Sequence, residues 1–251
     1  MRERWRSGAS LALLAALASG PALARCEDSP DPKVDWSGCV KNDLMLSRED
    51  LRSASMRRTS LSNTNFNRAN LAGANLSGAE LTFAKFDEAD LTGAGLHKAV
   101  AWRTSFRGAK LAGADLSSAQ MSRGNFQKAN LAGAKLGKSE FNRSDLTGAD
   151  LTGADLSKAE LSRVNFKDAK LDRTNLSSAN LSRARLAGAG LAEAQFAGAY
   201  MNLTNLAGVD LSRAAGLTQG QLDMSCGSPD TKLPAGLSAS KNWPCPADED
   251  D

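Results

Sequence analysis

Residues 144–161 read SDLTGADLTGADLSKAEL, and this stretch decides the fold. A large apolar residue returns at every fifth position, a small residue stands two places before it, and a polar residue lies between the two. The same period runs in both directions from Leu46 to Leu211, a span of 34 such positions. Ala101 is the single position in that span that is not large and apolar.

A period of five fits neither the 3.6-residue turn of a helix nor the two-residue alternation of a strand. One large and one small inward residue followed by a corner form one side of a square, so four units close a coil of about 20 residues. Coils stacked about 4.8 Å apart pair their backbones with the coils above and below. Five core phenylalanines are separated from one another by multiples of 20 residues, which predicts a column of rings inside one side of the coil: Phe66, Phe86, Phe106, Phe126 and Phe166.

The repeated unit A-(N/D)-L-x-x resembles the pentapeptide-repeat family, and the chain looks like an exported bacterial member. The resemblance implies an all-β fold, a right-handed quadrilateral β-helix of about eight to nine coils. We expect a signal peptide at 1–24, an N-terminal cap at 25–45, the β-helix at 46–215 and a C-terminal cap at 216–251. The last segment contains a capping box at Thr218 and Gln221, which predicts a short helix before the tail.

The first residues have the pattern of an export signal. Three arginines precede an uncharged stretch from Ser7 to Ala24, and the stretch ends in the small-residue motif Ala22-Leu23-Ala24. This order predicts cleavage after Ala24 and a periplasmic or secreted protein with no transmembrane segment left. The alternative is an uncleaved anchor, but the stretch is short and mostly Ala, below the roughly 20 strongly apolar residues that a span needs.

The four cysteines fall into two pairs, one near each end of the chain. In an exported protein this predicts the disulfides Cys26–Cys39 and Cys226–Cys245, which would fasten the two caps. Four cysteines allow three pairings, and the local one is favoured because a long repeat separates the pairs. A zinc site is the alternative, but the spacings are not those of C-x-x-C motifs and the lone His97 is distant in sequence.

Composition and motifs argue against catalysis. Apolar residues make up 41% and charged residues 24% of the chain, which excludes an ordinary disordered protein. A solenoid filled by Leu, Phe and Ala has no internal pocket, and the sequence has no nucleophile elbow, P-loop or H-E-x-x-H motif. We therefore expect no enzyme, no cofactor, no metal and no small-molecule substrate. His97 follows a core position and is expected to be an ordinary surface residue.

The corners of the coil carry the functional lead. The residue two places after the core position is basic in five consecutive coils, a candidate binding ridge: Arg103, Arg123, Arg143, Arg163 and Arg183. The opposite corner is bare: Gly73, Gly93, Gly113, Gly133 and Gly153. A third corner is basic in part: Arg58, Lys98, Lys138 and Lys158. We call the first set the arginine ridge and the second the glycine corner.

Two interpretations of the arginine ridge stay open. The ridge is either a solvated face paired with Glu140, Glu160 and Asp145, where each pair contributes little, or a linear anion-binding site. Trp102 sits outward beside the ridge, at the lapse in the core pattern. It is either a contact residue or a cover for an underfilled coil.

These features favour an exported, non-enzymatic structural or interaction module that presents a rigid face to an envelope partner. The alternative is a binder of polyanions or envelope glycans through the arginine ridge. The family also includes DNA mimics that protect gyrase, which need an acidic face and access to the cytoplasm. Here residues 1–24 hold three Arg and one Glu, so the remaining chain has 28 basic and 27 acidic side chains. That balance disfavours the mimic and nucleic-acid binding; a homodimer through a terminal cap stays open.

Overall fold

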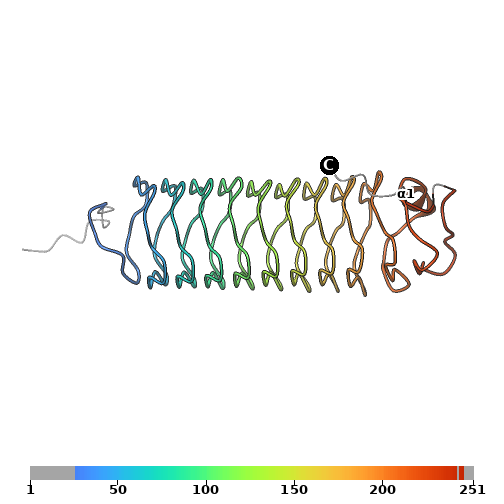
Figure 1. Ribbon diagram of the computed structural model, residues 1–251, viewed down its shortest axis with the longest axis horizontal. Coiled ribbons are helices and arrows are strands. Elements are labelled where there is room, and N and C mark those ends of the chain that lie inside the picture. The colour runs from blue at the N-terminus through green and yellow to red at the C-terminus, as the bar shows by residue number, and fades with distance from the viewer. Residues whose placement is uncertain (1–25, 242, 246–251) are drawn as a thin grey trace, which may run out of the picture.

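The computed structural model describes residues 26–241 and 243–245. The described residues wind into a rod of stacked coils, and their one helix lies at the C-terminal end of the rod (Figure 1). The expected signal peptide with its cleavage site, and the acidic tail from Asp248 to Asp251, lie outside the described residues.

Four ladders of single bridges hold the coils together. The residue before each core position forms a parallel bridge with the residue 20 places later, as in Asp35 with Ser55 and Asn125 with Asp145. Ser55, for example, donates its N–H to Val34 and accepts the N–H of Trp36 at its carbonyl, both at 2.8 Å. Each side of the square contributes one bridging residue per coil, so the ladders consist of isolated bridges rather than continuous strands.

The corners are tight turns whose second residue has positive φ. This residue adopts the left-handed conformation and donates its N–H to a carbonyl of the next coil, as Arg123 does to Asn142 at 2.9 Å. Glycine adopts such a φ at little cost, whereas other residues are strained there. Both kinds occur at the corners, for example Gly133 at φ 63° and Arg143 at φ 60°.

The interior is a continuous apolar core of the predicted Leu, Phe and Ala positions. The rings of Phe66, Phe86, Phe106 and Phe126 stack with centroid distances of 4.7, 4.9 and 4.8 Å, which also gives the rise per coil. Phe166 is fully buried but belongs to no stacked pair, since Leu146 holds the intervening slot.

One ring contact was not predicted from the register. Phe126 meets Phe141, from a neighbouring side, at 5.0 Å and a tilt of 49°. Gly124 leaves the room that Phe126 needs, because a Cβ on Gly124 would lie 2.7 Å from the Phe126 ring. Glycine at position 124 therefore avoids a clash with the Phe126 ring.

At the N-terminal end, the ladder begins at Asp35, inside the segment that we expected to be irregular. Trp36 fills the core slot there completely, and the charged Lys41 at the next slot places its Nζ 4.5 Å from the centre of the indole. The large ring covers the core end and accommodates the lysine, so the coil continues past a residue that breaks the sequence pattern. The disulfide Cys26–Cys39 ties the preceding segment to this coil.

At the C-terminal end, helix α1 (Gln219–Asp223) begins after the predicted capping box of Thr218 and Gln221. Gln221 also donates its Nε2 to the carbonyls of Phe196 at 2.8 Å and Ala199 at 2.9 Å. The helix thereby supplies a donor to the carbonyl of Ala199 and a second one to the carbonyl of Phe196, which already accepts the N–H of Ala199.

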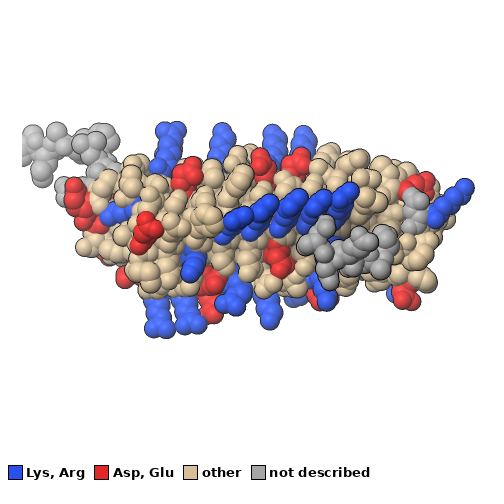
Figure 2. Space-filling view, turned by 45° about the horizontal axis from the view of Figure 1, so that its top comes forward, with Lys and Arg blue, Asp and Glu red and all other residues tan. Residues whose placement is uncertain are grey.

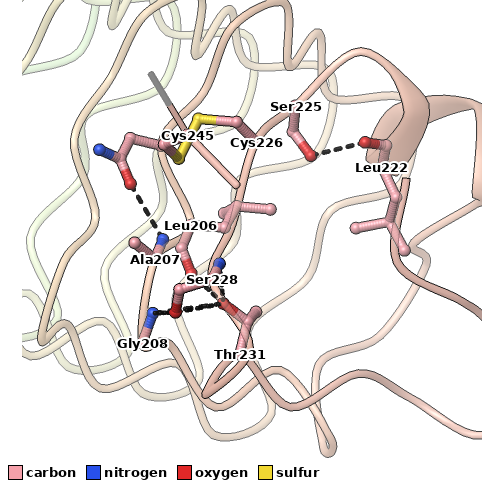
Figure 3. Close-up of a disulfide and its surroundings, with 10 residues drawn as sticks. Leu206, Ala207, Gly208, Leu222, Ser225, Cys226, Ser228, Thr231 and Cys245 are labelled. Carbon is pink, nitrogen blue, oxygen red and sulfur yellow. Dashed lines mark hydrogen bonds between the residues drawn. A yellow bond between two sulfur atoms is a disulfide. The ribbon is translucent and has the colours of Figure 1, made fainter. Parts of the chain in front are cut away.

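The segment after the helix continues two of the ladders, through Cys226 and through Lys232, which bridges to Asp210. Cys226 bridges to Asn205 and forms the disulfide with Cys245. The Thr231 hydroxyl donates to the carbonyl of Leu206 at 2.9 Å, beside Ser228 (Figure 3). Both disulfides that the cysteine spacing predicts are therefore present in the structure.

Candidate functional site

The arginine ridge occupies one corner of five consecutive coils. All five residues have positive φ, between 52° and 60°. Their backbone N–H groups donate to the next coil, at 3.1 Å for Arg103 to Ser122 and 2.9 Å for Arg143 to Ser162. A continuous row of Lys and Arg side chains runs along the rod in Figure 2. The main-chain ladder therefore fixes the spacing of the row before any partner binds.

Several charges elsewhere on the solenoid pair with an opposite charge in the neighbouring coil. Lys110 lies 3.7 Å from Asp90, one coil away, and Lys170 lies 3.6 Å from Asp150 in the same way. Arg68 pairs with Glu88 at 2.8 Å by the same step of 20 residues. Coil stacking can thus place opposite charges directly above one another.

The arginine ridge stacks like charge on like charge instead. In the described part of the chain, Arg103, Arg123, Arg143 and Arg183 form no ion pair. Two of the carboxylates expected to pair with these arginines accept hydrogen bonds from neutral amide side chains. Glu160 accepts one from Asn180 at 2.8 Å, and Asp145 accepts one from Gln127 at 2.6 Å. For these four arginines, the structure therefore does not contain the salt bridges that the first interpretation of the ridge requires.

The backbone of the ridge does not itself require arginine. The glycine corner has the same positive φ, 64° at Gly113 and 63° at Gly133, and the coil closes there without a side chain. A left-handed residue with a Cβ costs about 1 kcal/mol or more relative to glycine. The fold therefore does not require the five consecutive arginines, because the same turn forms with glycine.

Trp102 keeps its side chain half exposed, although Ala101 beside it is fully buried. The core at the lapse is closed by inward residues, among them Thr104, whose hydroxyl donates to the carbonyl of Leu81 at 2.7 Å. Trp102 remains on the surface beside Arg103. This placement favours a contact residue over a cover.

Sequence reasoning missed three exposed apolar residues close to the ridge: Phe83, Tyr200 and Leu203. Phe83 and Leu203 occupy the ridge corner one coil before and one coil after the arginines, and the Arg103 guanidinium lies 5.9 Å from the Phe83 ring centre. The same step of 20 residues that revealed the arginines would have found Phe83 and Leu203, but not Tyr200.

The remaining polar features of the described chain are ordinary surface contacts. His97 shares a hydrogen bond of 2.9 Å with the Ser117 hydroxyl. No group of metal-ligating side chains gathers in the part of the chain that the structure describes. Nor does any helix among the described residues have the length and apolar character to cross a membrane.

Comparison with known proteins identifies the family. The profile "Pentapeptide repeats (8 copies)" matches residues 54–93 and 89–127, and "Pentapeptide repeat region" matches residues 119–196. Together they span more than half of the chain, which belongs to the pentapeptide-repeat family. No curated protein matches the sequence.

Two solved structures share the fold. HetL, a pentapeptide repeat protein involved in heterocyst differentiation regulation in the cyanobacterium Nostoc sp. strain PCC 7120, is 29% identical, with a TM-score of 0.70 over 78% of this chain and 88% of HetL. QnrB1, a plasmid-mediated fluoroquinolone resistance protein, is 18% identical, with a TM-score of 0.56 over 72% of this chain and 88% of its own. These likenesses identify the solenoid as a right-handed quadrilateral β-helix; that to QnrB1 concerns the fold alone.

Proposed function

We propose that this protein is an exported, non-enzymatic interaction module that binds an anionic partner of the cell envelope along its arginine ridge. Proteins of this family typically act as structural or interaction modules. The observation that carries the proposal is that Arg103, Arg123, Arg143 and Arg183 form no ion pair in the described chain, whereas other stacked charges of the solenoid pair with the opposite sign. Guanidinium groups bind carboxylates and phosphates through paired hydrogen bonds, so a fixed row of them suits a row of anions.

Export is supported by the two disulfides, which persist in oxidising compartments. The expected signal peptide provides the route. We assign the disulfide-fastened terminal segments the role of caps, because an open solenoid end exposes unpaired backbone groups that recruit other chains.

A second candidate is the binding of an envelope polyanion, such as an acidic glycan, through the same residues. The even spacing of the row favours it, because a repeating anion presents charge at regular intervals. Protection of gyrase by mimicry of DNA needs an acidic surface, and the ridge has the opposite sign.

The test uses fluorescein-labelled poly-glutamate and the protein that begins at residue 25. The triple variant Arg123→Gln, Arg143→Gln, Arg183→Gln should lower the affinity at least about tenfold and flatten its dependence on salt, because three fixed cations are lost. The matched control is Arg58→Gln, Lys98→Gln, Lys138→Gln, which removes the same charge from positive-φ positions of another corner. Thermal unfolding of each variant checks that it folds.

The control triple should leave most of the affinity in place. Equal losses in both triples would mean diffuse attraction by overall charge, and the arginine ridge would not be the site. Crosslinking of the exported protein in the periplasm, with the same two triples, then identifies the partner.

A further inference from the structure

The exposed apolar side chains of this protein are not scattered over its surface. Seven large apolar residues of the described chain are exposed, and two of them, Val40 and Met45, belong to the first coil. The other five lie at the two ends of the arginine ridge: Phe83, Trp102, Tyr200, Leu203 and Met224. Single exposed apolar residues are ordinary, but such a distribution along one line marks a contact surface.

At the N-terminal end of the ridge, Phe83 and Trp102 lie in consecutive coils. The N–H of Phe83 donates to the carbonyl of Trp102 at 3.0 Å, so the backbone holds the two residues next to each other. Their side chains are 49% and 50% exposed. We call this pair the first anchor.

At the other end, Leu203 stands at the ridge corner and Tyr200 precedes it by three residues. The N–H of Leu203 donates to the carbonyl of Met224 at 2.7 Å, which brings the residue after helix α1 to the same place. Tyr200 and Leu203 are each half exposed, and Met224 is exposed to a smaller extent. We call this group the second anchor.

Phe83 and Leu203, the corner residues of the two anchors, have a strained backbone conformation. Phe83 and Leu203 have φ of 61° and 55°. A bulky residue in the left-handed region is a genuine outlier, and glycine fills this slot at many other corners. In the described chain the other three corners carry no exposed large apolar residue. Apolar side chains therefore stand at strained positions of the one corner that also holds the arginines.

The distance between the anchors sets the size of a ligand. Phe83 and Leu203 are six coils apart, and each coil rises 4.7 to 4.9 Å. The line between them is therefore about 29 Å long, the length of about nine residues of extended polypeptide. The arginines occupy its middle, with no aromatic residue between Arg103 and Arg183 at that corner.

We infer that the ligand is an extended acidic segment of a protein, about nine residues long, with an apolar residue at each end. This inference rests on the proposed function and names the chemistry of the partner. Trp, Tyr and Arg are the residues that dominate protein interfaces, and the rigid ladder places them in advance of binding. A glycan has no apolar side chain to bury against Leu203 and Met224. Single-stranded nucleic acid needs stacking platforms along its whole path, whereas here the aromatics stand only at the ends.

The experiment compares four labelled probes: an anchored peptide with acidic residues in its middle and a Phe and a Leu at its ends, the same peptide with Ser at both ends, a heparin fragment and oligo-thymidine. The anchored peptide should bind at least about fivefold more tightly than its Ser-ended counterpart. Trp102→Ala and Tyr200→Ala should each remove most of that difference and leave the affinity for the Ser-ended peptide unchanged. Val40→Ala and Met45→Ala are the matched controls, because they truncate exposed apolar residues of the first coil, two coils before the first anchor and outside the span between the two anchors.

Two results would overturn the inference. In one, Trp102→Ala and Tyr200→Ala leave the preference for the anchored peptide intact, or no preference exists. In the other, heparin or oligo-thymidine binds as tightly as the anchored peptide. In either case the proposed function still stands if the arginine triple abolishes binding. Binding that survives the arginine triple refutes the proposed function itself.

Discussion

The arginine ridge and the glycine corner lie on opposite sides of the same coils and have the same backbone. At Arg123 and Gly133 the chain makes the same turn, with φ of 60° and 63°. On the side that leads into the glycine corner, stacked charges neutralise one another, as Lys110 does with Asp90. At the ridge the stacked charges are alike.

This difference shows how little the fold constrains the outside of a coil. The inward residues and the ladder satisfy packing and hydrogen bonding for both corners equally. The side chain at the turn is then free to serve something else, at a cost of backbone strain and mutual repulsion. Glycine at these positions would avoid both the strain and the repulsion. Because the ridge has arginine there instead, it is the surface to test for function.

The largest effect comes from the core that both corners share. Phe126→Ala should lower the free energy of unfolding by about 3–5 kcal/mol, because it removes a fully buried ring that stacks on Phe106 and touches Phe141. Chemical denaturation measures the change. A loss below about 1 kcal/mol would show that the corners do not depend on a rigid core, and the comparison between them would lose its basis.

A smaller effect separates the two corners directly. Gly133→Ala should destabilise the protein by about 1 kcal/mol, through the backbone alone, since no atom lies within 4 Å of the added Cβ. Arg123→Gly should leave stability unchanged or raise it by up to about 1 kcal/mol, while it weakens poly-glutamate binding. Equal destabilisation by both changes would mean that arginine, too, supports the fold.

The smallest effect concerns the paired charges on the glycine side. Hydrogen bonds from Ser212, together with Lys232 at 3.1 Å, lower the pKa of Asp210 to about 2 from an ordinary 3.8. Because the folded pKa is depressed, Asp210 stabilises the fold above pH 4 and loses this contribution as the pH falls toward 2.

Asp210→Asn should therefore lower the denaturation midpoint at pH 6 and matter less as the pH approaches 2. Asp223→Asn, at the last residue of helix α1, is the matched control, because it makes the same substitution at another exposed carboxylate. A constant difference between Asp210→Asn and the wild type across the whole pH range would contradict the ionic origin of the effect.

Much of the fold was predictable because each five-residue unit repeats one local geometry. The inward positions, the helix after Thr218 and the two disulfides follow from spacing, and the structure contains all of them. The start of the ladder at Asp35 was not predicted, since Lys41 breaks the apolar pattern. Its accommodation against the face of Trp36 depends on a contact between units, which the period does not describe.

The same limit applies to the candidate site. The register placed five arginines in one column and located Trp102 beside them. It did not decide whether Glu160 would pair with an arginine or accept from Asn180, because that choice depends on side-chain conformation.

By itself, the sequence determined the square coil, its apolar filling and the line along which the arginines stand. A period of five leaves one geometry that buries every large residue and pairs every backbone group. The tertiary structure decided which charges find partners, how Phe126 meets Phe141, and that the segment after helix α1 brings Met224 beside Leu203 at the end of the ridge. These outcomes depend on contacts between coils and on the path of the irregular segments, for which a five-residue period contains no information.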